Sequence, residues 1–175
     1  MARIKIDYGI DLGTTNSAIA RMENGESVIK QTKIGMDTLP SCVYFSKNKK
    51  GECALRIGLT AKNSVYSDAI TALSKNEPPK EYGYLEFKRE MGSDKKYSNE
   101  NMPKEYYSPE ELSAEVLKEL KSLINDETVN SVVITVPAMF TAIQKDATMK
   151  AARIAGFKQC ELLQEPIAAC MAYGL

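Results

Sequence analysis

Tyr8-Gly9-Ile10-Asp11-Leu12-Gly13-Thr14-Thr15-Asn16-Ser17 carries an apolar β pattern into an acidic residue, a glycine and small hydroxyl residues. We expect Asp11 to end a strand, where its carboxylate suits Mg²⁺ held through water, because hard cations prefer oxygen ligands. Gly13 lets the backbone turn closely around a ligand, and residues 14–16 offer N–H groups and hydroxyls to phosphate oxygens. The same residues fit a β-hairpin with a polar turn. This stretch alone therefore leaves a phosphate loop and a hairpin open.

The composition predicts one ordinary globular unit without a nucleic-acid or membrane partner. Of the 175 residues, 43% are hydrophobic and 26% are charged, as in typical globular domains. With 23 basic and 23 acidic residues the net charge is zero, so no basic surface for nucleic acid or anionic lipid is expected. Residues 1–5 lack the apolar run of a signal peptide, and no run approaches the roughly 20 residues of a membrane span. We therefore expect a cytoplasmic protein.

The chain holds no histidine, so catalysis would rest on carboxylates, lysine and metal-bound water. Its cysteines form no CxxC pair and fall mostly in apolar stretches. This pattern favours reduced packing residues over disulfides or a zinc site. The cysteines are Cys42, Cys53, Cys160 and Cys170.

The first half of the chain predicts an antiparallel β start. Asn24-Gly25 is a strong tight-turn signal between two of the strands. A short helix is expected to begin near Ala61, and the stretch from there to residue 107 is polar, rich in tyrosine and weakly periodic. That stretch is a candidate for a separate subdomain. The expected strands are 3–11, 17–22, 27–31, 41–45 and 53–57.

The second half predicts alternating helices and strands. Ser108 is expected to cap a helix, with Pro109 in its first turn and Glu111 closing a capping box. Two short apolar runs further on predict strands buried on both faces, each followed by a helix. With the first half, this order gives a mixed α/β sheet covered by helices. The strands are 131–136, ended by Pro137, and 159–163; the helices are 141–155, ended by Gly156, and one from 165 onward.

Three separated segments resemble, in order, the heat-shock protein 70 (DnaK-type) chaperones. Residues 9–17 resemble the first phosphate loop of that family, and residues 108–123 resemble the helix that leads back from its insertion. The third segment resembles the family's connecting segment and begins with Val133-Ile134-Thr135-Val136-Pro137-Ala138-Met139-Phe140. It continues with residues 152–157 and ends with Glu165-Pro166-Ile167-Ala168-Ala169-Cys170-Met171-Ala172-Tyr173-Gly174-Leu175.

The resemblance implies an actin-like ATPase fold of ribonuclease H-like type, a mixed sheet with flanking helices and an inserted small α+β subdomain. Residues 1–38 and 109–175 would form the base subdomain, and residues 39–108 the upper one. Nucleotide would lie between this lobe and a second lobe, which has no counterpart in the sequence; nor has the peptide-binding domain. We therefore expect an N-terminal fragment of a chaperone that hydrolyses ATP at full length, and an isolated lobe that is inactive or very weak.

The resemblance also implies ATP or ADP with Mg²⁺ as ligands. Asp11 and Glu165 would act on the metal through water, and Lys88 would position the attacking water and offset charge near the γ-phosphate. From the residues alone, Asp11 is equally a strand-end carboxylate, Lys88 a surface charge and Glu165 a carboxylate at a helix N-terminus. The chain is longer than the family pattern before Lys88. The phosphate loop would comprise Gly13, Thr14, Thr15 and Asn16, with Thr14 closest to the transferred group.

The resemblance places a conformational relay at Pro137 and Lys145, although strand termination explains Pro137 equally well. Unfolded peptides would bind through a domain not present. Five positions depart from the residues Tyr, Asp, Arg, Lys and Arg that the family usually carries on its linker and J-domain surface. We therefore expect a diverged interface for a J-domain co-chaperone and a nucleotide exchange factor. The five departures are Met139, Ala142, Lys145, Met149 and Glu161.

Two other classes of function stay open at this stage. The same fold occurs in sugar kinases and in actin-like filament or cell-shape ATPases. The sequence of residues 165–175 argues against a sugar kinase, but the filament proteins share it in weaker form. A non-catalytic, nucleotide-sensing interaction module is the other class. Loss of Asp11, Lys88 or Glu165 would have favoured such a module, and all three are present.

Overall fold

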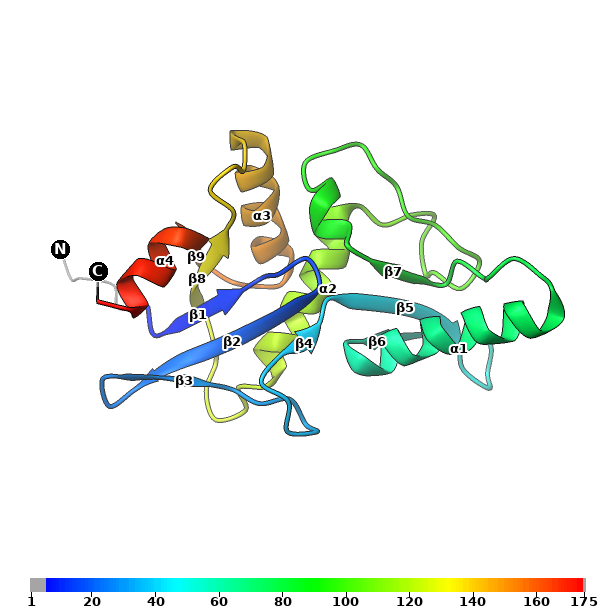
Figure 1. Ribbon diagram of the computed structural model, residues 1–175, viewed down its shortest axis with the longest axis horizontal. Coiled ribbons are helices and arrows are strands. Elements are labelled where there is room, and N and C mark those ends of the chain that lie inside the picture. The colour runs from blue at the N-terminus through cyan, green and yellow to red at the C-terminus, as the bar shows by residue number, and fades with distance from the viewer. Residues whose placement is uncertain (1–5, 175) are drawn as a thin grey trace.

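The computed structural model describes residues 6–174, which form two β-sheets with helices around them (Figure 1). The strands are β1 (Tyr8–Asp11), β2 (Asn16–Glu23), β3 (Glu26–Ile29), β4 (Leu39–Pro40), β5 (Cys42–Lys47), β6 (Cys53–Ile57), β7 (Gly83–Leu85), β8 (Ser131–Val136) and β9 (Gln159–Gln164). The helices are α1 (Leu59–Lys75), the 3₁₀ turn η1 (Phe87–Glu90), α2 (Pro109–Ser122), α3 (Ala142–Ile154) and α4 (Glu165–Ala172).

The larger sheet is mixed and runs in the order β3-β2-β1-β8-β9, with β4 also paired to β2. β1, β2 and β3 are antiparallel neighbours, whereas β8 and β9 continue from β1 in parallel. Asn24 and Gly25 both have positive φ in the turn from β2 to β3, as their sequence signal predicts. The expected antiparallel start and mixed α/β sheet are confirmed.

The smaller sheet runs in the order β6-β5-β7, and α1 packs along it (Figure 1). The expectation of a short helix near Ala61 was wrong in length, because α1 spans 17 residues. Its C-terminus is set by Asn76, which takes the left-handed conformation that ends many helices. The polar stretch that follows α1 contains β7 and η1, which its weak periodicity did not predict.

Helix α2 lies behind the meeting point of the two sheets and contacts both of them (Figure 1). The hydroxyl of Ser108 accepts the Glu111 N–H, and the Glu111 carboxylate accepts the Ser108 N–H, so the predicted capping box is confirmed. One hydrophobic cluster runs from the larger sheet through α2 into the smaller sheet. The buried residues of α2 are Pro109, Glu110, Leu112, Ser113, Ala114, Val116, Leu117 and Leu120.

Three details of the expected strands were wrong. Within residues 6–11, only 8–11 form a strand, and the expected start at Arg3 lies outside the described residues. Burial alternates along β8, and in β9 only Cys160 is buried, so neither strand is covered on both faces. The reason is that α3 packs on β9, while α4 contributes no buried residue of its own.

The cysteines divide into two pairs by burial. Cys42 and Cys160 pack in the interior, where burial raises the pKa of the Cys42 thiol to about 12 and that of Cys160 to about 11. Cys53 and Cys170 are exposed, so the packing role expected for them was wrong. All four are unbridged, as expected. None of the helices in residues 6–174 combines the length and hydropathy of a membrane span.

The α2 interface gives a stability prediction. Leu117 is fully buried, so Leu117→Ala is expected to lower the free energy of unfolding by about 2–5 kcal/mol in urea titration. Leu73 on α1 is 81% exposed, and the same substitution there should change that free energy by about 0.5 kcal/mol or less. Equal losses in the two variants would contradict the placement of the core.

Candidate functional site

The carboxyl ends of three adjacent parallel strands meet at one edge of the larger sheet. β1 ends at Asp11, β8 ends directly before Pro137, and β9 ends directly before Glu165. In open α/β sheets, ligands bind outside this edge, where loops and helix N-termini gather. Three of the residues chosen from the sequence therefore lie at the same edge, although Asp11 is more than 100 positions from the other two.

The strand register explains the position of the Asp11 side chain. Asp11 lies opposite Thr135 in the parallel pairing of β1 with β8, and the Thr135 hydroxyl donates to the Asp11 carboxylate at 3.0 Å. Asp11 is exposed, so its remaining oxygen lone pairs face solvent. The carboxylate is thus held in place and still open to water or a hydrated cation.

The turn between β1 and β2 folds tightly over Gly13. A Cβ at this position would lie 2.0 Å from the Asn16 carbonyl oxygen, so only glycine fits. Two buried hydroxyls hold the turn: Gly13 N–H donates to Ser17 Oγ at 3.1 Å, and Ser41 Oγ donates to the Gly13 carbonyl at 2.8 Å. These hydrogen bonds therefore hold the backbone of the turn on its buried side.

The outer residues of the turn remain available to a ligand. Thr15 and Asn16 are exposed and Thr14 is half-buried. Within residues 6–174, the hydroxyls of Thr14 and Thr15 have no hydrogen-bond partner, whereas those of Ser17 and Ser41 bond to each other. The turn thus presents small donors to solvent on a rigid backbone, which suits an anion such as phosphate.

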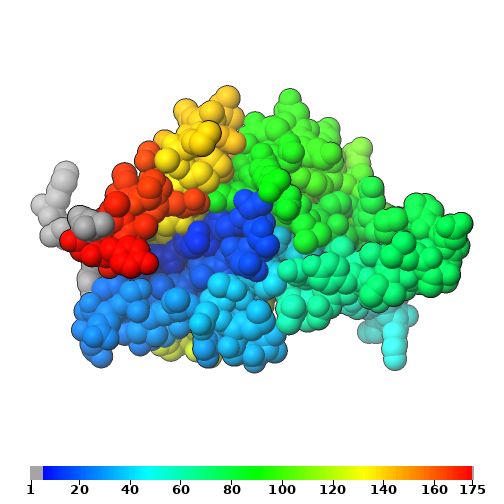
Figure 2. All heavy atoms as spheres, in the orientation of Figure 1, coloured from blue at the N-terminus to red at the C-terminus, as the bar shows by residue number. Residues whose placement is uncertain are grey.

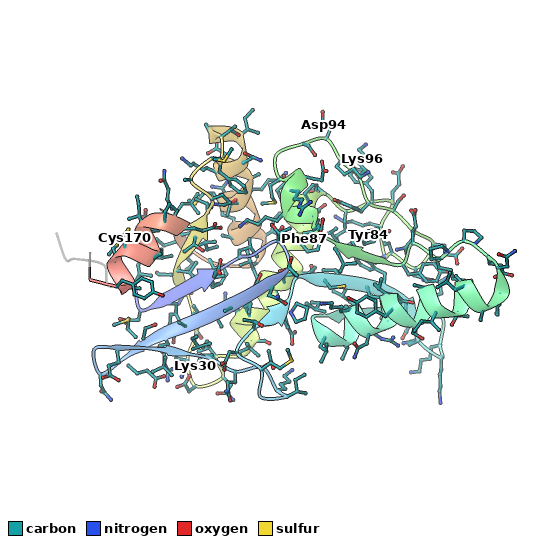
Figure 3. The ribbon with its side chains drawn as sticks, in the orientation of Figure 1. Lys30, Tyr84, Phe87, Asp94, Lys96 and Cys170 are labelled. Atoms are coloured by element: carbon teal, nitrogen blue, oxygen red, sulfur yellow. The ribbon has the colours of Figure 1, made fainter. Side chains whose placement is uncertain are left out.

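Lys88 reaches the same edge from the smaller sheet. Its ammonium lies 3.1 Å from the Glu165 carboxylate, although the two residues are 77 positions apart. The Lys88 side chain is only 6% exposed, that of Glu165 is 43% exposed, and the Phe140 ring lies 5.4 Å from the Lys88 nitrogen. Phe87, the preceding residue, is buried (Figure 3), and η1, which carries both residues, packs against α2.

Figure 2 shows the blue N-terminal segment at the surface, between the orange and red C-terminal helices and the green middle of the chain. The edge combines a turn of small donors, the exposed carboxylates of Asp11 and Glu165, and the nearly buried ammonium of Lys88. Within residues 6–174, no three acidic or cysteine side chains gather to bind a metal directly. This donor set fits a cation that keeps much of its water shell, as Mg²⁺ does.

The residues predicted as relay and partner surface lie on and before α3, except one. Pro137 is half-buried at the end of β8, and its carbonyl accepts the Phe140 N–H at 3.1 Å. Within residues 6–174, the Lys145 ammonium forms no hydrogen bond or ion pair, so nothing ties it to Pro137. Met139 is 92% exposed. Ala142 is exposed on α3, Met149 packs against the core and Glu161 is exposed on β9.

Sequence reasoning missed the residues that hold the site in position. Thr135, Phe140, Ser17 and Ser41 all act through contacts between distant segments. The strand register would have revealed Thr135, since it lies beside Asp11 once β1 and β8 are aligned. A depression of about 500 Å³ elsewhere, lined in part by Lys104 and Glu111, contains none of the site residues.

A mixed sheet with a glycine turn after its first strand, and with charged groups at the ends of its parallel strands, is an α/β arrangement whose edge suits a phosphate group. Residues 7–175 match the family model described as Hsp70 protein. The chain therefore belongs to the Hsp70 family. The match supports a nucleotide-binding module of the chaperone type, in a family that binds nucleotide and Mg²⁺, clients and co-chaperones.

The glycine turn gives a second prediction. Gly13→Ala is expected to lower the free energy of unfolding by about 1–3 kcal/mol, because its Cβ would overlap the Asn16 carbonyl. Gly9→Ala, four residues earlier on β1, is the matched control, since nothing lies within 4 Å of a Cβ there. Chemical denaturation of both variants decides the matter: similar stability would mean that the turn does not require glycine.

Proposed function

We propose that this chain binds ATP with Mg²⁺ at the carboxyl edge of β1, β8 and β9, and that it is the ATP-hydrolysing lobe of an Hsp70-type chaperone. The observation that carries the proposal is the contact between Lys88 and Glu165 at the sheet edge where β1 ends before the Gly13 turn. A nearly buried lysine is costly unless its charge is used or paired. Here it is directed at the edge where the phosphate loop lies.

Each residue has a role that its position supports. Residues 13–16 donate N–H groups and hydroxyls to the phosphate oxygens. The Lys88 ammonium offsets negative charge on the transferred group, and Glu165 orients the attacking water. Phosphoryl transfer depends mainly on such positioning and electrostatic stabilisation. Lys88 is held by burial, and Glu165, in the first turn of α4, is held by its ion pair with Lys88.

The carboxylates of Asp11 and Glu165 are the groups that would hold Mg²⁺ through its water shell. Bound Mg²⁺ supplies positive charge that neutralises phosphate oxygens. Asp11 is fixed by Thr135 and exposed on its other side, which suits an acceptor of hydrogen bonds from metal-bound water. Retention of Asp11 and Glu165 at this edge, with Lys88 paired to Glu165, favours catalysis over a non-catalytic module.

We propose the subdomain division 1–38 with 109–175 and 39–108, in an actin-like ATPase fold. The separate strand orders of the two sheets support it. β4 lies at the proposed boundary, because its residues pair with β2 of the larger sheet. The site then lies where Lys88 of the inserted subdomain meets Glu165 of the base subdomain. We place the protein in the cytoplasm, as its family suggests.

Substitution of the ion pair tests the catalytic proposal. In the intact protein, Lys88→Met and Glu165→Gln are each expected to lower kcat for ATP by about 100-fold or more, because each removes charge or positioning at the transition state. Arg89→Met is the matched control, since Arg89 adjoins Lys88 but is exposed and, among residues 6–174, forms an ion pair only with Glu86 at the surface. Its kcat should equal that of the unmodified protein.

Steady-state ATP turnover and calorimetric titration of ATP provide the readouts. Retained turnover in Lys88→Met would overturn the proposed role. A loss of turnover in Arg89→Met equal to that in Lys88→Met would show that any change in η1 has the same effect.

We further propose that unfolded peptides are the clients, and that the co-chaperone surface is altered. The exposed, apolar Met139 and the exposed Glu161 support the altered co-chaperone surface, since lost polarity and reversed charge disfavour binding of the family's usual J-domain partner. A standard J-domain should stimulate ATP turnover weakly in this protein. Stimulation should increase in a variant that restores the family residues, and equal stimulation of both would contradict the proposal. The restoring substitutions are Met139→Tyr, Ala142→Asp, Lys145→Arg, Met149→Lys and Glu161→Arg.

A further inference from the structure

Glu110 is a buried carboxylate that the proposed reaction does not use. It lies in the first turn of α2 and is 4% exposed, a rare environment for a glutamate unless it has partners. Its neighbour Glu111 already closes the capping box with Ser108 and pairs with Lys104. Helix capping therefore accounts for the position of the Glu111 carboxylate but not for the burial of Glu110.

The Glu110 carboxylate binds the segment that carries Lys88. The Gly92 N–H donates to Glu110 Oε1 at 3.0 Å, only four residues after Lys88. Hydrogen bonds to a carboxylate are stronger than neutral ones. One turn further along α2, the buried Ser113 hydroxyl donates to the Met91 sulfur at 3.4 Å. The exit of η1 is thus attached to α2 at two successive residues.

Helix α3 also contacts Gly92 and Glu110. Gly92 has φ +78°, and a Cβ there would lie 2.7 Å from the Ile143 side chain and 3.2 Å from its carbonyl oxygen. Lys150, also on α3, lies 3.8 Å from the second carboxylate oxygen of Glu110 but is largely exposed. Gly92 is itself exposed, but it lies between Glu110 of α2, its hydrogen-bond acceptor, and Ile143 of α3.

We infer that Glu110 is a positioning residue, whose carboxylate holds the Lys88 segment against α2 and α3 and so sets the place of the Lys88 ammonium beside Glu165. The inference rests on the proposed ATP hydrolysis for its catalytic consequence. Glu110 touches no reacting group; it acts through the backbone of Gly92 and the 3₁₀ turn. A shift of the Lys88 ammonium by a fraction of its distance from the Glu165 carboxylate would reduce turnover and leave the turn at residues 13–16 intact.

The test compares variants of the two adjacent glutamates in the intact protein. Glu110→Ala is expected to lower kcat for ATP by about tenfold or more and to leave KM within about threefold, because Lys88 is misplaced while the phosphate turn is unchanged. Glu110→Gln keeps an oxygen acceptor for Gly92 and should restore most of the turnover. Glu111→Ala removes a first-turn acid and the half of the capping box that its carboxylate provides, so it should lower thermal stability without changing kcat.

A readout that needs no turnover separates this inference from the proposed function. The side-chain ¹⁵Nζ resonance of Lys88, measured by NMR without nucleotide, should shift in Glu110→Ala and stay unchanged in Glu111→Ala. Should Glu110→Ala fail to fold, Glu110→Asp keeps the charge but withdraws it by one methylene, and the same shift and loss of kcat are expected.

An unchanged Lys88 resonance in the folded Glu110 variants would overturn the positioning role, as would equal losses of kcat in the Glu110 and Glu111 variants. If the unmodified protein hydrolyses no ATP, the proposed function fails, while the Lys88 resonance still decides whether Glu110 places that lysine.

Discussion

Burial of one face of α2 holds the two sheets in a single orientation. Leu112, Leu117 and Leu120 are fully buried in a cluster that also contains Phe45 of the smaller sheet and Ile10 of the larger one. An amphipathic helix gains most of its stability from such packing and little from helix propensity. Without this shared core, the smaller sheet would have no fixed position relative to the edge where the parallel strands end.

The proposed site depends directly on that orientation. Asp11 and the Gly13 turn belong to the larger sheet, whereas Lys88 follows the smaller one and meets Glu165 only because both sheets pack on α2. α2 also supplies Glu110, which binds Gly92 beyond the 3₁₀ turn. The helix therefore has two roles: its middle joins the sheets, and its first turn holds the lysine segment.

Local signals in the sequence predicted local structure well. The capping box at Ser108 and the turn at Asn24-Gly25 formed because their partners lie within a few residues. The length of α1 was missed although Tyr66, Ile70 and Leu73 recur at helical spacing, and because these side chains are exposed, the spacing does not mark a buried face. An apolar run also does not show which faces will be covered, and for this reason β8 and β9 are less buried than expected.

The site residues could be chosen from family resemblance, but their contacts could not be derived from spacing. Lys88 and Glu165 meet across 77 positions, and Asp11 and Thr135 meet across 124. The most direct test of one catalytic unit is a double-mutant cycle on single-turnover ATP hydrolysis with Lys88→Met, Glu165→Gln and both together. Residues that act as a unit should give a double variant within about threefold of the slower single variant. If the losses of rate in the two single variants multiply in the double variant, Lys88 and Glu165 act independently, which would contradict the account.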